Sequence, residues 1–145
     1  MFPYCAGLVS ESVPLNVCGV QTVYPWVCDC KAYSYQWILH NGPKTDHHFA
    51  DMCSLAKTGS GFCYRCNKSH AAVVPQGLVH KTGVCGFSCK PFSTAMVDRL
   101  SKGSAGHEDV GLWEAWIEEI VRLDLDEAWS ENVMGIAIRE SRQNP

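Results

Sequence analysis

The chain has 145 residues and a mass of 16.0 kDa, a length that suits one compact domain or a small domain with an appendage. Hydrophobic residues make up 46% of it and charged residues 19%, which excludes a globally disordered chain. The net charge of −3 divides unevenly: residues 28–90 carry seven basic and three acidic residues, whereas residues 91–145 carry five basic and eleven acidic ones. A basic centre and an acidic tail suggest different surfaces and different partners.

The N-terminal stretch MFPYCAGLVSESVPL predicts no export signal, because it has no early lysine or arginine and polar residues interrupt its apolar run. No apolar run approaches the length that spans a bilayer. We therefore expect a cytoplasmic or nuclear protein that is not secreted. In a reducing compartment, nine cysteines without a signal peptide favour metal binding over a disulfide framework.

The first half of the chain predicts short strands. Residues 7–27 are rich in valine, leucine and threonine and predict one or two of them. Residues 31–40, KAYSYQWILH, alternate apolar and polar side chains and predict another strand. Residues 71–85 predict a hairpin around a Pro-Gln-Gly turn. Residues 92–100 change to a helical period, with apolar side chains four residues apart.

The acidic tail predicts two helices. SKGSAG, residues 101–106, is the best candidate for a linker. Beyond it, residues 108–123 place two tryptophans and two isoleucines on one helical face, and residues 126–138 form a second apolar stripe. We read the tryptophan stripe first as core packing against the rest of the chain.

The strongest chemical signal is a set of four cysteines that could hold zinc. Cys63-x2-Cys66 is followed, after eighteen residues, by Cys85-x3-Cys89. Zinc takes four soft or borderline ligands in a tetrahedron, and a close cysteine pair supplies two thiolates from one tight turn. The order of knuckle, hairpin and helix-borne second pair resembles the treble-clef arrangement. The competing interpretation is that these cysteines are small buried hydrophobes.

A second metal site is possible upstream. Its histidine is ambiguous because two adjacent histidines lie in this stretch, and the competitors are His40, His47 and His70. Sequential and interleaved pairings both remain open, so we expect one or two zinc ions. The ligands that we favour for this second site are Cys28, Cys30, His48 and Cys53.

These observations predict an α+β fold. We expect a small zinc-stabilised domain over residues 1–103, built on a treble-clef-like element with short strands. An acidic C-terminal helical hairpin over residues 104–145 would pack on it. Zinc binding would stabilise so small a core, since metal binding is coupled to folding.

Two enzymatic alternatives rest on short resemblances. Gly61-Phe62-Cys63-Tyr64 resembles the nucleophile segment of viral papain-like leader proteases, which implies a cysteine protease with Cys63 as nucleophile and His107 as its base. Asp46-His47-His48 with the Cys63 pair resembles zinc-bearing HNH nucleases, which implies metal-dependent phosphodiester hydrolysis. The second pattern departs from its family, because no asparagine lies between residues 49 and 62.

We favour a non-enzymatic function: an intracellular zinc-binding accessory or regulatory protein, of a kind that viruses also use. It would act by binding nucleic acid, RNA in the first place, or a partner protein. The tryptophans of the acidic helices, common interface anchors, would contact a protein partner, and no membrane contact is expected. The residues that could contact nucleic acid through phosphates and base stacking are Tyr64, Arg65, Lys68 and Lys81.

Overall fold

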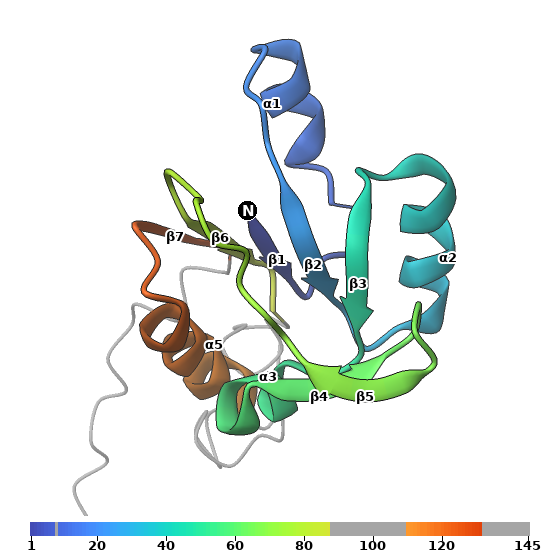
Figure 1. Ribbon diagram of the computed structural model, residues 1–145, viewed down its shortest axis with the longest axis vertical. Coiled ribbons are helices and arrows are strands. Elements are labelled where there is room, and N and C mark those ends of the chain that lie inside the picture. Colours follow the sequence, from blue (N-terminus) through green and yellow to red (C-terminus); the bar gives the residue numbers. More distant parts are fainter. Residues whose placement is uncertain (8, 88–109, 132–145) are drawn as a thin grey trace, which may run out of the picture.

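The computed structural model describes residues 1–7, 9–87 and 110–131 (Figure 1). The strands are β1 (Phe2–Tyr4), β2 (Tyr24–Cys28), β3 (Thr45–Phe49), β4 (Ser60–Cys63), β5 (Lys68–Ala71), β6 (Thr82–Cys85) and β7 (Glu127–Ser130). The helices are α1 (Ser12–Val17), α2 (Ala32–Asn41), α3 (Met52–Thr58) and α5 (Val110–Leu123). None of these described helices combines the length and apolar character that crossing a membrane requires.

All seven strands belong to one sheet, in the order β5-β4-β3-β2-β1-β6-β7. The five strands from β3 to β7 in that order run parallel, and β4 and β5 extend the sheet at the β3 side as an antiparallel hairpin. Parallel neighbours cannot be joined by a tight turn, so the chain must cross over between them. Helix α2 makes the crossover from β2 to β3 (Figure 1).

The sheet is covered on both faces. Successive strand side chains point to opposite faces, and Trp26 and Val27 on β2 belong to two different core clusters. Trp26 packs in the larger cluster with α3 and α5, which contact each other, whereas Val27 packs with Ile38 of α2. Helix α2 therefore covers one face, and α3 and α5 cover the other.

The mixed α and β character that the sequence predicts is confirmed, and so is the helix predicted over residues 108–123, which is α5. Residues 31–40 were expected as a strand, and this prediction is wrong, because they fall within and just before α2. These residues also suit a helix, because the two buried positions, Ser34 and Ile38, lie four residues apart and therefore on one helical face. The crossover between parallel strands favours the helix here over the local pattern.

The predicted hairpin over residues 71–85 does not form. Strand β5 pairs with β4, while β6 pairs with β1, so four strands separate the two segments in the sheet. Residues 127–130 are strand β7 beside β6 and not the start of a second helix. A treble clef and a C-terminal helical hairpin are therefore not confirmed. The helix predicted over residues 92–100 lies outside the described residues.

Close packing of α5 on β6 requires a glycine at position 83. A Cβ built on Gly83 would lie 2.4 Å from Leu125 Cδ1 and 2.6 Å from Trp116 Cη2. We expect Gly83→Ala to lower the free energy of unfolding by about 1–3 kcal/mol, because the added methyl overpacks the core. The measurement is urea unfolding followed by tryptophan fluorescence. Gly86→Ala is the matched control, since its nearest neighbour is 4.0 Å away, and an equal loss in both variants would contradict this packing.

Candidate metal centre

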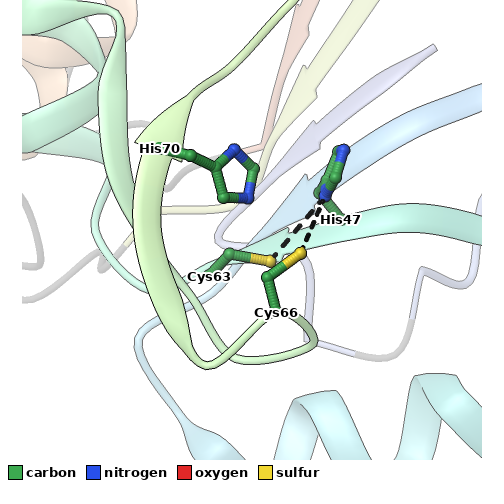
Figure 2. Close-up of side chains that lie close together, drawn as sticks. All are labelled: His47, Cys63, Cys66 and His70. Atoms are coloured by element: carbon green, nitrogen blue, oxygen red, sulfur yellow. Dashed lines mark hydrogen bonds between the residues drawn. The ribbon is translucent and has the colours of Figure 1, made fainter.

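Four side chains with metal-binding atoms converge between strand β3 and the β4–β5 hairpin (Figure 2). They are His47, Cys63, Cys66 and His70, and one donor atom from each lies within 4.8 Å of the other three. His47 Nδ1 is 3.4 Å from Cys66 Sγ and 4.0 Å from Cys63 Sγ. Among the described residues this is the one group of three or more such side chains that could hold a metal ion.

The antiparallel hairpin explains how these residues meet. Strand β4 ends at Cys63, a tight turn over residues 64–67 follows, and β5 returns with His70 opposite Gly61. Asn67 closes the turn with a φ of 50°, a left-handed conformation that asparagine tolerates better than most residues. His47 comes from β3, the strand beside β4. Two thiols from one turn and one imidazole from each flanking strand thus face one point.

The hydrogen bond that His70 makes to the backbone leaves its second ring nitrogen able to bind a metal ion. Its Nδ1 donates to the Ala71 carbonyl oxygen at 2.8 Å, which assigns the ring proton to Nδ1 and leaves a lone pair on Nε2. That Nε2 is buried, and the His70 side chain interacts with the Cys63 thiol. A carbonyl that fixes the tautomer in this way is a common outer partner of metal-binding histidines.

Backbone amides support a thiolate at Cys63. Its side chain is fully buried, and the His48 N–H lies 3.4 Å from its Sγ. Burial raises the pKa of Cys63, but the N–H groups of Cys66 and His48, with His70, outweigh it and hold the pKa below its usual range. The pKa of Cys66 is raised by partial desolvation and by the neighbouring Cys63. Cys63 is therefore the first of the two thiols to ionise.

His47, on β3, is held in its neutral form. Burial, and secondarily the proximity of His70, lower the pKa of His47. A neutral imidazole and a thiolate are the forms in which histidine and cysteine bind metals. The environment of the cluster thus favours the metal-binding forms of His47 and Cys63.

The described residues do not bring the predicted four-cysteine set together. Cys63 and Cys66 lie in the cluster, but Cys85 lies on β6, with β3, β2 and β1 between it and β4. Cys85 is fully buried, and a hydrogen bond with Cys5 together with burial raises its pKa. Cys89 lies outside the described residues. The side chains that lie beside the two knuckle cysteines are therefore two histidines, one of which follows Cys66 by four residues.

The second predicted site is not assembled. Cys28 and Cys53 belong to the core cluster on the α3 and α5 face, while Cys30 is exposed directly after β2. His48 points to the other face, where its ring meets Tyr35 of α2 edge-on at a centroid distance of 5.3 Å. Strand alternation explains the choice between the adjacent histidines, because His47 and His48 must point to opposite faces.

His48 is fully buried, and neither ring nitrogen has a hydrogen-bond partner among the described residues. Burial lowers its pKa to about 4. Its ring lies between aromatic neighbours, with Tyr64 at a centroid distance of 5.5 Å. His48 is therefore neutral core packing and not a ligand of the cluster.

Cys63 and His48, described residues of the two enzymatic alternatives, are both buried. Cys63 is 0% exposed and its Sγ faces the cluster, so substrate has no access to it as a nucleophile. His107, its predicted base, lies outside the described residues. Of the nuclease pattern, His48 is sealed in the core.

The four residues predicted to contact nucleic acid divide into two groups. Tyr64 and Arg65 lie in the turn between β4 and β5, and Lys68 begins β5. Arg65 and Lys68 are exposed, whereas Tyr64 is half-buried and donates to the Cys30 carbonyl oxygen at 3.0 Å. Lys81 lies beside β6, where its Nζ donates to the Leu123 carbonyl oxygen at 2.8 Å. Three of the four residues thus lie in the turn or directly after it.

Comparison of the chain with protein-family models, curated proteins and solved structures finds no match. Any inference about function therefore rests on the fold and on the His/Cys cluster.

Proposed function

We propose that the cluster binds one zinc ion and that the turn held by this ion forms a nucleic-acid-binding surface. The observation that carries the proposal is the convergence of His47, Cys63, Cys66 and His70 within 4.8 Å. Two thiolates and two imidazoles are a donor set typical of structural zinc sites. Harder cations such as Mg²⁺ and Ca²⁺ prefer oxygen ligands, so this donor set favours zinc.

The spacing of the donor atoms suits a zinc tetrahedron. Zn–S bonds of about 2.3 Å and Zn–N bonds of about 2.0–2.1 Å place neighbouring ligand atoms roughly 3.3–3.8 Å apart. The distances from His47 Nδ1 to the Cys66 and Cys63 Sγ atoms, 3.4 and 4.0 Å, lie close to that range. Small side-chain movements would bring the His47 and cysteine donor atoms into that range.

Zinc would fasten the hairpin to the rest of the sheet. Strands β3 and β4 share one residue pair in register, Phe49 with Cys63, so the pairing that anchors the hairpin is short. A zinc ion bound by His47 of β3 and by three hairpin residues would crosslink the two. Because all four positions would be filled by protein, no position remains for a reactive water, which favours a structural role over a hydrolytic one.

The turn also carries exposed cationic and aromatic groups. Arg65 and Lys68 are exposed, and Phe62, 40% exposed, precedes them on β4. Within the described residues no carboxylate forms an ion pair with either cation, although Asp46 is exposed nearby on β3. Unpaired cations beside an aromatic side chain suit phosphate contact with base stacking.

The competing proposal, a protein partner that docks on the acidic helices, has less support. Trp116 is 1% exposed and belongs to the core, and Trp113 packs on Phe87 at a ring distance of 5.4 Å. Trp129 alone among these anchors is largely exposed, at 63%. The core interpretation of the tryptophan stripe is confirmed for Trp116.

We expect Lys68→Gln to weaken the binding of a labelled 12-mer single-stranded RNA several-fold and to reduce the salt dependence of binding by about one phosphate contact. Fluorescence anisotropy of the zinc-loaded protein at several salt concentrations measures both. Lys57→Gln is the matched control, because Lys57 is an exposed lysine on α3, outside the β4–β5 hairpin. Equal effects of the two variants, or no RNA binding by the parent protein, would refute the nucleic-acid half of the proposal.

A further inference from the structure

A depression of about 280 Å³ lies where the C-terminal end of α2 leads into β3. Its walls include Tyr35, Leu39 and Pro43, and its rim carries Lys44 and Arg65. Arg65 belongs to the zinc-held turn, so the depression adjoins the surface proposed to bind nucleic acid. Its volume lies just below the range of sites for drug-sized ligands, which suits one small planar group.

The two cations at the rim are available to an anion. Arg65 Nη1 donates to the Thr45 carbonyl oxygen at 2.9 Å, which orients the guanidinium and leaves donors on its other nitrogens. Lys44 is exposed. In the described ranges neither cation is paired with a carboxylate. A depression lined by polar as well as apolar groups, with two cations that no carboxylate in the described ranges neutralises, complements an aromatic ring that carries a negative group.

The aromatic wall is held in place by its neighbours. The Tyr35 ring is stacked on Tyr64 with centroids 6.0 Å apart and planes at 16°. The same ring meets His48 edge-on at 5.3 Å. A ring fixed in this way offers a stacking platform that loses little freedom when a base binds, and such stacking contributes about 1–3 kcal/mol per base.

We infer that this depression holds one unstacked nucleobase of a single strand, with the adjoining phosphate on Arg65 and Lys44. The inference rests on the proposed nucleic-acid function and deepens it, because it names the form of nucleic acid that is recognised. A base inside a duplex is stacked and paired and cannot enter such a site, whereas a single strand can turn one base outward.

The test compares two tyrosines of α2. Zinc-loaded parent protein, Tyr35→Leu and Tyr33→Leu are titrated into a labelled 12-mer oligouridylate, a 12-mer oligoadenylate and a 12-base-pair RNA duplex. Tyr33 is 69% exposed and does not line the depression, which makes it a matched control. We expect Tyr35→Leu to weaken single-strand binding roughly 5- to 150-fold, the equivalent of 1–3 kcal/mol, with Tyr33→Leu and duplex binding unchanged.

The possible outcomes distinguish failure of the base site from failure of the proposed nucleic-acid-binding function. RNA binding that is sensitive to Lys68→Gln but equal for single strand and duplex, and indifferent to Tyr35→Leu, overturns the base site and leaves the proposed function standing. No binding of either RNA overturns both. If Tyr35→Leu fails to fold, amide chemical shifts of the parent protein with uridine monophosphate decide: shifts at Leu39, Lys44 and Arg65 support the site, and their absence at saturating nucleotide refutes it.

Discussion

Replacing Cys66 with serine is expected to abolish zinc binding and to lower the free energy of unfolding by several kcal/mol. Cys66 Sγ lies 3.4 Å from His47 Nδ1 at the centre of the cluster, and a serine hydroxyl is a poor zinc ligand. Structural zinc contributes an apparent binding free energy of about 10–16 kcal/mol at neutral pH, and that energy stabilises the fold. Thermal and urea unfolding, with and without a chelator, measure the loss.

Two controls sharpen this prediction. Chelator should lower the stability of the parent protein toward that of Cys66→Ser and have little effect on the variant. Cys30→Ser, a change at an exposed cysteine outside the cluster, should behave like the parent protein. Equal losses of stability in Cys30→Ser and Cys66→Ser would contradict the assignment of the zinc ligands to the cluster.

The second large effect is expected at a buried carboxylate on α5. Glu119 is fully buried and accepts hydrogen bonds from Arg122, through Nε at 2.6 Å and Nη2 at 2.7 Å, and from the Tyr4 hydroxyl. Glu119→Ala leaves the guanidinium and the phenol without this partner. Removing one partner of a buried ion pair costs about 3–5 kcal/mol. We expect a loss of that order in urea unfolding.

The neighbouring residue supplies the control. Glu118 lies on the same helix but is exposed, so Glu118→Ala should change stability by less than about 0.5 kcal/mol. A loss below about 1 kcal/mol in Glu119→Ala would show that the network contributes little and that α5 is held by its apolar contacts.

Cys63, Cys66 and His70 of the candidate metal site lie close together in the sequence and could be predicted from it, whereas His47 could not. Cys63-x2-Cys66 is a tight-turn signal, and His70, four residues after Cys66, lies within the same hairpin. The choice of His47 over His48 depends on which face of β3 meets the hairpin, and the spacing of the cysteines contains no information about that. The prediction favoured Cys85 because the treble-clef spacing was regular, but in the sheet three strands lie between β4 and β6, the strand that carries Cys85.

The fold shows the same division. Helix α5 has a long amphipathic period and was predicted correctly. Helix α2 was mistaken for a strand because its ten residues alternate in polarity, and only the parallel pairing of β2 with β3 requires a helix between them. Strand β7 has four residues, all exposed, so no alternation marks it. It is defined by its pairing with β6, a contact that is distant in sequence.

Native mass spectrometry of the intact protein would show whether the cluster holds zinc. We expect one tightly bound zinc ion per chain, which is lost in Cys66→Ser and in His70→Ala and retained in Cys30→Ser and Cys53→Ser. A metal-free parent protein prepared with zinc available, or zinc retained in both cluster variants, would contradict it.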